Sequence, residues 1–482
     1  MAVIAAFILN AALNFVVGLL IAWLLGPEAF GVFALATAGA VVLNTLLFEW
    51  LRLSATRFYS VRVRADEPWI RHGLDRAYAV LALGLFAAAM LCAGLSLTID
   101  PGTGSRTALT AGAALAALGI GVFDYHAALA RARFDGGLYL RLVAVKNALA
   151  FVLMTGTAWF LPQPIWVLIA AGASQFLAVV LMRTALADPA LPVLRVRLRQ
   201  TWRLFLVYGL PLIAANAIYQ IMPFLNRAVL ATQSGFAEAG YFALAADVTA
   251  RALGTLGTAL DLLLFQLAVR AEEHEGQAAA EAQIGRNAAV VVALMLPCAA
   301  GLWAVLPALQ ALVVPEAYRG PFALYAGLLI PGLFCLALVN FALNPIFQIR
   351  RKTMPVIAAA LAGLAANGLG LLVLPGLVGP SGIALAQSLG LAVATLVLAL
   401  RALTGPERVA LPWRDIAGAG LGCLAMVLAL LPFRMLAPGA ALAICIPLGI
   451  VVYGAAIWLF DIAGLRGLVA ERFGKGRPAA AE

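Results

Sequence analysis

Charge is the property that this sequence has least of. Asp, Glu, Lys and Arg make up only 11% of its 482 residues, whereas hydrophobic residues make up 64%, and the mean hydropathy is +1.01. Soluble globular domains carry about 25% charged residues. The composition therefore excludes a soluble fold and predicts an all-α protein that crosses a membrane many times. The gaps between its apolar segments are too short for a soluble catalytic domain, which needs ~50 residues or more.

The sequence also lacks the patterns of metal, redox and nucleotide sites. It has no Gly-rich phosphate loop of the Walker type and no H-E-x-x-H motif. Its five cysteines lie in apolar stretches without metal-ligand spacing, and we interpret them as small core residues without disulfides. The sequence therefore predicts no cofactor, no metal and no enzymatic activity, and it excludes ATP as the direct energy source.

The net charge of +10 is compatible with a nucleic-acid partner, but the position of the charge argues against one. Most Arg and Lys lie in short gaps between apolar segments, which is typical of cytoplasmic loops. Alternate gaps are basic, and the positive-inside rule then places both termini in the cytoplasm. We expect the first apolar run to be retained as a membrane helix, because it is long for a signal peptide.

Apolar segments of about 20 residues predict fourteen membrane helices. They cover residues 2–25, 30–60, 74–97, 107–130, 138–161, 164–186, 204–231, 240–268, 287–312, 321–349, 354–374, 381–403, 415–435 and 440–462. We assign them to a six-helix lobe (1–187), a basic cytoplasmic linker (188–203), a second six-helix lobe (204–403), and an extra helix pair with a cytoplasmic tail (404–482).

A short internal repeat supports two similar lobes. The motif GVFALA at 31–36 recurs as GYFALA at 240–245, and each copy opens the second helix of its lobe. Six helices per lobe give both lobes the same orientation, so an axis along the membrane normal relates them. Substrate sites in such folds lie near the midplane between the halves. In this register Asp261 corresponds to Arg52, and we expect the two to approach each other across a central cavity.

The most informative stretch is 44–60, which lies in an apolar segment long enough to cross the membrane and yet carries Glu49 and Arg52. With Thr45 and Thr56 they form one polar stripe on a helix. An ionisable group at membrane depth costs about 3 kcal/mol or more unless it faces protein or water. The stripe therefore predicts a polar environment. The alternative is that Glu49 and Arg52 pair only with each other and help the helix to pack.

Other polar residues define possible cavity faces, and each has a structural alternative. Amide and hydroxyl side chains that share helix faces could hydrogen-bond a polar cargo or simply bond neighbouring helices. Arg57 could bind an anion or snorkel to the interface, and Arg251 could pair with Asp247 four residues earlier. The full set of candidate substrate-binding residues is Arg52, Arg57, Glu49, Asn14, Asn216, Tyr219, Gln220, Arg251, Asp261 and Asn344.

Several motifs resemble one family. LLGPEAFGVFALA (24–36), the helical stretch with Arg52 and Arg57, and the segments at 209–211, 226–230, 238–241 and 382–386 are similar to polysaccharide (O-antigen or exopolysaccharide) flippases of the MATE-containing MOP superfamily. The family often has Asp-Arg where this chain has Asn226-Arg227, which weakens any role for a carboxylate there. The resemblance covers nearly the whole chain, but its motifs are loose and mostly apolar.

The resemblance implies a two-lobed fold of twelve helices, here with one extra pair. It also implies transport of undecaprenyl-pyrophosphate-linked oligosaccharides across the bacterial inner membrane, with membrane lipids and polysaccharide polymerase or chain-length proteins as partners. Arg52 is then the first candidate for the pyrophosphate, because guanidinium binds phosphate oxygens bidentately. A cation-coupled drug or metabolite exporter of the same fold is the alternative, and that class needs a mainly acidic cavity.

Overall fold

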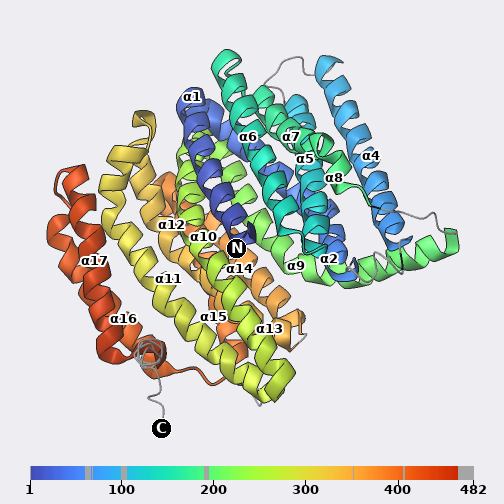
Figure 1. Ribbon diagram of the computed structural model, residues 1–482. Coiled ribbons are helices and arrows are strands. Elements are labelled where there is room, and N and C mark those ends of the chain that lie inside the picture. The colour runs from blue at the N-terminus through green and yellow to red at the C-terminus, as the bar shows by residue number, and fades with distance from the viewer. Residues whose placement is uncertain are drawn as a thin grey trace, which may run out of the picture. The chain divides into compact units, whose positions relative to one another are not determined.

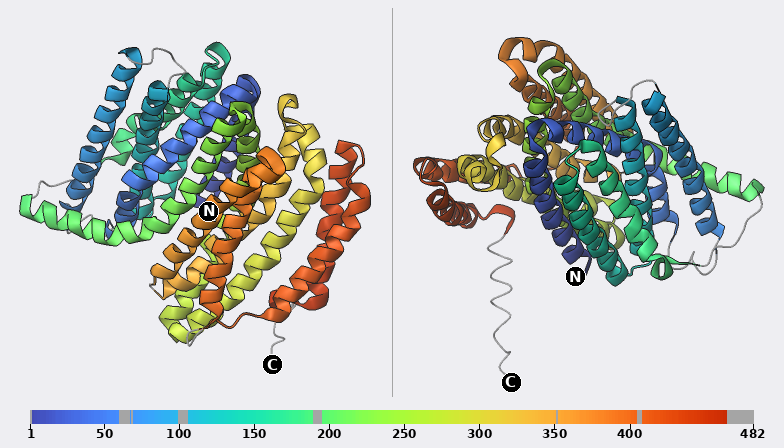
Figure 2. Two further views of the ribbon diagram at one scale, coloured as in Figure 1. Left: turned by 180° about the vertical axis from the view of Figure 1, so that it is seen from behind. Right: turned by 90° about the horizontal axis from the view of Figure 1, so that it is seen from above.

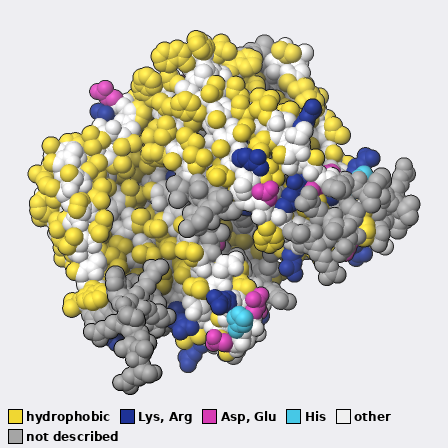
Figure 3. Space-filling model, viewed as in Figure 1, with side chains coloured by type: hydrophobic (Ala, Val, Ile, Leu, Met, Phe, Trp, Pro, Cys, Tyr) yellow, Lys and Arg dark blue, Asp and Glu magenta, His cyan; other side chains and the backbone are white. Residues whose placement is uncertain are grey.

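The computed structural model describes residues 2–59, 67, 69–98, 106–188, 195–350, 352–404 and 408–464. Within these ranges the chain is helical and contains no β-strand, which confirms the all-α prediction (Figure 1). Hydrophobic side chains cover most of the face seen in Figure 3, and charged side chains are few on it. Such a surface suits the hydrocarbon core of a bilayer.

The helices group into two compact units, which are described separately. The first unit is Met1–Leu244 with Val373–Ile383, and the second is Ala245–Leu372 with Ala384–Glu482. The first contains α1 (Ala2–Leu47), α2 (Glu49–Phe58), α4 (Trp69–Thr98), α5 (Arg106–Ala132), α6 (Gly136–Phe160), α7 (Pro164–Leu181), α8 (Arg183–Leu186) and α9 (Arg195–Ser234).

The second unit continues from α10 (Phe236–Glu275), whose first turns belong to the first unit. It contains α11 (Gln277–Val313), α12 (Pro321–Leu338), the π-helix η2 (Val339–Leu343), α13 (Asn344–Ile349), most of α14 (Met354–Val378), α15 (Gly382–Leu403), α16 (Trp413–Leu430) and α17 (Pro438–Phe460). Contacts thus group α9 with the N-terminal helices, whereas the predicted lobes at 1–187 and 204–403 separate them. The lobes are repeat units and stay a prediction.

The number of membrane helices agrees with the sequence. Eleven stretches of the described chain are long and apolar enough to span a membrane, and a bent pair in α9 raises this to twelve. Two of these stretches, Leu9–Leu47 and Met354–Leu403, each contain two helices, separated at Gly26 and at the short η3 (Gly379–Ser381). Counting each of them as two gives the fourteen helices that the apolar segments predict.

The break predicted between the helices 2–25 and 30–60 is confirmed. Gly26 breaks α1 with φ 73° and ψ 171°, a conformation that glycine adopts without steric cost, and Pro27 opens the next helix. The predicted second helix, 30–60, is interrupted at Phe48, so Thr45 belongs to α1 while Glu49 opens α2. The backbone hydrogen bonds from Phe48 to Asn44 (2.8 Å) and from Arg52 to Phe48 (3.1 Å) continue across this break.

The helix predicted to begin at 204 begins earlier, because α9 starts at Arg195, within the predicted linker 188–203. The helix forms because Leu198, Trp202 and Phe205 recur at helical spacing. Trp202 donates from its indole nitrogen to the carbonyl oxygen of Gly73 at 2.9 Å, and Phe205 is fully buried. The helix then bends by 54° before Ile213, where Pro211 lacks a backbone donor. The first part of the predicted linker, 189–194, lies outside the described residues.

Two other boundaries differ from the sequence analysis. The polar gap predicted at 269–286 is helical except at Gly276 (φ 86°), where α10 ends and α11 begins. The predicted helix 321–349 is one span, but it widens into the π-helix η2 just before Pro345. Proline lacks a donor and its ring crowds the preceding turn, so a local π-helix accommodates it.

Close helix packing in the first unit depends on small residues. A Cβ on Gly119 of α5 would lie 2.3 Å from the backbone oxygen of Gly172 on α7, so the two backbones touch directly. Small residues allow this approach between membrane helices, where packing rather than the hydrophobic effect drives association. Beside this contact, buried apolar side chains of α5, α6 and α7 form one cluster that includes Leu142, Ala178 and Val179.

In the second unit, α16 and α17 lie side by side and pack on α11 (Figures 1 and 2). Cys423, Met426 and Tyr453 form their buried core. The Tyr453 hydroxyl donates to the backbone oxygen of Ala293 at 2.5 Å. At the turn between the two helices, the guanidinium of Arg434 lies 3.9 Å from the centre of the Trp303 ring, a cation–π contact that fixes this end of the pair.

Candidate functional site

The polar stripe on α2 opens with an ion pair. Arg52 donates to the carboxylate of Glu49, one turn earlier on α2, and the Thr56 hydroxyl donates to the backbone oxygen of Arg52 at 3.1 Å. The structure therefore contains the pairing that the packing alternative requires. The pair is not sealed, however, because the Arg52 side chain is 30% exposed and its buried Nε has no hydrogen-bond partner among the described residues.

Two charged residues of α5 extend this pair into a cluster. The charge of Asp124 interacts with those of Arg52, Glu49 and Arg131. The Arg131 guanidinium lies 5.5 Å from the centre of the Tyr139 ring on α6, and its buried Nε also lacks a hydrogen-bond partner in the described chain. Asp124 is seven residues from Arg131, so it lies about 10 Å deeper along the same face of the helix.

Lys146 of α6 is the third cation of the cluster. Its ammonium donates to the side-chain oxygen of Asn10 at 2.9 Å and lies 5.5 Å from the centre of the Phe123 ring. The charges of Lys146 and Asp124 interact. Asn14 donates to the same Asn10 oxygen at 2.8 Å, so the two amides share a face of α1.

This charged cluster comprises three cations and two carboxyl groups, from α2, α5 and α6: Arg52, Arg131, Lys146, Glu49 and Asp124. Its cationic side chains outnumber its carboxyl groups by three to two. Excess positive charge with unused guanidinium donors can hold an anion. Among the described residues no group of three or more His, Cys, Asp or Glu is placed to hold a metal ion.

Buried amides lie near this cluster in sequence. Asn147 follows Lys146, is only 1% exposed, and has neither amide atom hydrogen-bonded within the described chain. Asn44, four residues before Phe48, has a buried side-chain oxygen that also accepts no hydrogen bond within the described chain. Polar groups buried in this way are costly unless water or a ligand satisfies them.

The sequence analysis missed Asp124, Arg131 and Lys146 as site residues. The signal that could have found them is an ionisable residue inside an apolar segment, which usually marks function. Asp124 and Lys146 lie inside α5 and α6, eight or more residues from the helix ends at Ala132 and Gly136.

The remaining candidates of the first unit are spread along two helices. Arg57 is exposed at the end of α2. On α9, Asn216 is exposed and Gln220 is half-buried, while the Tyr219 hydroxyl is buried without a partner in the described chain. Arg227, near the end of α9, is buried and donates to the backbone oxygen of Ala34 at 3.0 Å, which gives it a structural role.

Three candidates belong to the second unit. Arg251 is exposed and Asp261 half-buried, both on α10. Asn344 is the first residue of α13, directly after the π-helix, and its buried side-chain oxygen has no partner in the described chain. Arg52 and Asp261 lie in different compact units, and their approach across a cavity stays a prediction.

A second polar network closes one end of the first unit. The carboxylate of Asp188, which follows α8, accepts from the Tyr59 hydroxyl at 2.9 Å and from Arg71 at 3.1 Å, and it pairs with Arg133. Arg71 also donates from Nε to both oxygens of Asp75 at 2.9 Å. Burial and the bond to Asp188 raise the pKa of Tyr59 to about 12. This network joins α2, α4, α5 and the end of α8.

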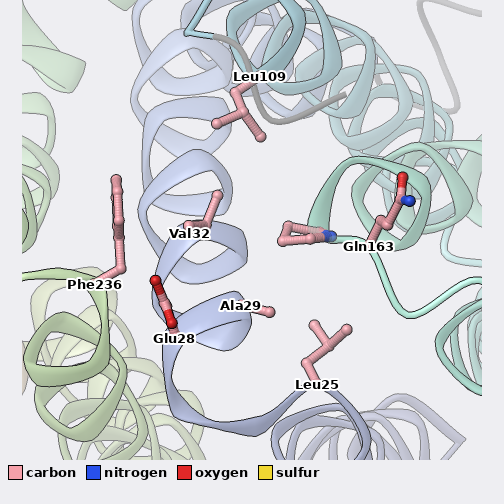
Figure 4. Close-up of a pocket in the computed structure, with 8 residues that line it drawn as sticks. Leu25, Glu28, Ala29, Val32, Leu109, Gln163 and Phe236 are labelled. Carbon is pink, nitrogen blue, oxygen red and sulfur yellow. The ribbon is translucent and has the colours of Figure 1, made fainter. Parts of the chain in front are cut away.

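At the other end of the first unit lies a cavity of about 490 Å³ (Figure 4). Its walls are mostly apolar, and Glu28 and Gln163 provide the polar side chains. Glu28 projects from the turn region of α1 beside Phe236 of α10, while Gln163 lies on the opposite wall before α7. The cavity is therefore built where three helix turns meet, and it lies in the first unit only.

The sequence matches no protein-family model and no curated protein. The fold, in contrast, matches solved structures. The lipid II flippase MurJ in an inward closed conformation superposes with a TM-score of 0.74 and 14% sequence identity, over 96% of this chain and 99% of that chain. The chain has a MATE/MurJ-like fold.

Two MATE structures agree with this result. An inward-facing multidrug resistance MATE family transporter of the MOP superfamily gives a TM-score of 0.55 at 15% identity, over 80% of this chain and 92% of that one. A mutant of the Vibrio cholerae MATE transporter VcmN gives 0.53 at 14% identity, over 83% and 95%. The fold implied by the resemblance to the MOP superfamily is therefore confirmed, and the MurJ match extends over nearly the whole chain.

Proposed function

We propose that this chain is a flippase that moves undecaprenyl-pyrophosphate-linked oligosaccharides across the bacterial inner membrane by alternating access. The observation that carries the proposal is the charged cluster, in which Arg52, Arg131 and Lys146 outnumber Glu49 and Asp124. Ionisable side chains in membrane helices usually mark a substrate or ion site, or pair with one another. A MATE/MurJ-like fold supplies two units that can alternate around a cargo.

In this proposal the Glu49–Arg52 ion pair on α2 is the state of the binding site without cargo. Glu49 holds Arg52 in place while the site is empty, and the pyrophosphate competes for the guanidinium. A guanidinium can exchange one oxyanion for another without losing its charge, because it stays protonated in proteins. Arg131 and Lys146 add the positive charge that a dianionic group needs. Asn14, with Asn10, belongs to the same polar surface.

The main competitor is a cation-coupled exporter of drugs or metabolites on the same fold. An exporter of organic cations needs excess negative charge at the site, because like charges repel at short range. The cluster in the first unit has the opposite balance. The candidates Arg57, Asn216, Tyr219, Gln220, Arg251, Asp261 and Asn344 are proposed to line the path of the glycan. The cytoplasmic termini, the inner-membrane location and the polysaccharide-assembly partners belong to this proposal.

The test compares Arg52→Ala with Arg52→Lys in a strain whose own copy of the gene is deleted. We expect deletion to leave a lipid-linked sugar on the inner leaflet, and Arg52→Ala to leave it there too. Arg52→Lys should restore part of the transport, because it keeps the charge but loses the bidentate geometry. Arg76→Ala is the matched control, since Arg76 is exposed on α4.

Full glycan export by Arg52→Ala, at wild-type protein levels in the membrane, would remove Arg52 from the mechanism. Deletion that leaves every lipid-linked sugar normally distributed but lowers the efflux of an organic cation would favour the exporter instead.

A further inference from the structure

The repeat motif found in the sequence makes a reciprocal contact in the structure. A Cβ on Gly31 would lie 1.9 Å from the backbone oxygen of Phe236, and a Cβ on Gly240 would lie 2.1 Å from the backbone oxygen of Pro27. Gly240 follows Gly31 by 209 residues, and Phe236 follows Pro27 by the same number. The contact of Gly31 with Phe236 is therefore the repeat equivalent of the contact of Gly240 with Pro27.

Such reciprocity is what a two-fold axis produces, because residue i contacts j while the equivalent of i contacts the equivalent of j. The contact involves only residues up to 244, so it lies wholly within the first unit. It strengthens the interpretation of the motif as a true structural repeat. The axis passes between the second helix of α1 and the first turns of α10.

The two helices also begin in the same way. Gly26 (φ 73°) precedes the second helix of α1, and Gly235 (φ 92°), again 209 residues later, precedes α10. Positive φ angles at glycine allow a helix to change direction with changes in few dihedral angles. Four residues after Gly240, at Leu244, the boundary between the two compact units crosses α10. Each helix thus has a glycine hinge before the contact. In α10 the boundary between the two compact units follows the contact.

We propose that the Gly31–Gly240 contact breaks when this end of the transporter opens, so that the two repeats separate there. We call this contact the pivot. This rests on the proposed alternating access but not on the identity of the cargo. Backbone contacts through glycine have no interlocking side chains, so the helices can separate without rotamer changes. Arg227, which donates to the Ala34 oxygen in the same stretch of α1, holds the closed arrangement. Phe236 links the pivot to the cavity beside Glu28 (Figure 4).

The test adds one methyl group at the pivot. Gly31→Ala and Gly240→Ala each place a Cβ where the structure has a backbone oxygen, so the closed contact cannot form. Ala38, seven residues after Gly31 on the same face and 8% exposed, is the reporter. In a chain whose five native cysteines are replaced by alanine, Ala38→Cys is labelled with a membrane-impermeant maleimide. Gly18→Ala is the control, because a Cβ there meets nothing within 4 Å.

We expect the thiol introduced by Ala38→Cys to be labelled at least several-fold faster in either pivot variant than in the control. The double variant should be little faster than the singles, because both remove the same contact. Equal labelling in Gly31→Ala and Gly18→Ala overturns the proposal. This outcome is independent of the cargo, so it can fail while the flippase proposal stands, or hold if the cargo is a different molecule.

A second measurement covers the case in which a pivot variant does not fold. Trp23 and Thr232 are exposed, correspond to each other in the repeat, and flank the pivot on α1 and α9. Spin labels at Trp23→Cys and Thr232→Cys, with both glycines intact in lipid nanodiscs, report the separation directly. Two populations of distance support a pivot that opens and closes. One narrow population overturns it.

Discussion

Replacing Asp188 by alanine removes the carboxylate on which one end of the first unit depends. Its side chain is fully buried, and it faces Tyr59, Arg71 and Arg133. Arg71 keeps Asp75 as a second charged partner. Arg133 also donates to two backbone oxygens of α8, which are neutral. The substitution therefore removes a shared counter-charge from two buried guanidinium groups.

Breaking a buried ion pair by removing one partner costs about 3 to 5 kcal/mol, because the remaining charge stays desolvated. We expect Asp188→Ala to lower the free energy of unfolding by about that amount. Asp188→Asn keeps the shape and one acceptor, and should cost roughly half as much. Asp135→Ala is the comparison. Asp135 is exposed and caps α6 by accepting from the Leu138 amide at 2.8 Å, a bond whose loss costs about 1 kcal/mol.

Unfolding of the purified protein in detergent, followed by tryptophan fluorescence against denaturant, measures these differences. The double variant Asp188→Ala with Arg133→Met should lose less stability than the two single variants together, since the second change removes one of the charges that the first leaves without its carboxylate. If Asp188→Ala is no more destabilising than Asp135→Ala, the network is not held by its buried carboxylate, and the reasoning is refuted.

Three further predictions concern single contacts. Burial raises the pKa of Tyr59 from 10 to about 12, so its contribution is complete below pH 10 and is lost as the pH rises toward 12. Tyr59→Phe should therefore make the fall in stability over that range shallower, and parallel pH–stability curves for the two proteins would contradict this. Gly119→Val should destabilise by about 1 to 3 kcal/mol or prevent insertion, because its Cβ meets a backbone oxygen of α7 at 2.3 Å; an unchanged melting temperature would show that α5 and α7 can move apart freely. Arg434→Gln should cost about 1 kcal/mol through loss of the stacking on Trp303, and a double-mutant cycle with Trp303→Leu that gives no coupling would exclude the contact as a source of stability.

Several features of the fold followed from the sequence because a bilayer leaves few alternatives. Long apolar segments must form helices that satisfy their own backbone, so their number and approximate limits could be predicted. The turn at Gly26 could be predicted as well, since a Gly-Pro pair stops one helix and starts the next. The helical start of α9 was missed, because charge was interpreted as a loop signal. The spacing of Leu198, Trp202 and Phe205 was the better guide.

The candidate site was predicted in part. Glu49 and Arg52 stood out because both are ionisable and share one helix face, and the structure shows them paired. That Asp124, Arg131 and Lys146 join them could not be predicted, because the three come from α5 and α6, and a single sequence does not say which faces of separate helices meet.

The sequence by itself determined that this chain is a polytopic helical membrane protein with a repeated motif, because hydrophobic length and period are local properties. Only the tertiary structure decided that cations gather around Arg52, that Asp188 closes one end of the first unit, and that Gly31 and Gly240 touch reciprocally. These contacts join segments that lie far apart in the chain. Which such segments meet depends on the packing of all the helices together, and that is not a property of any one stretch.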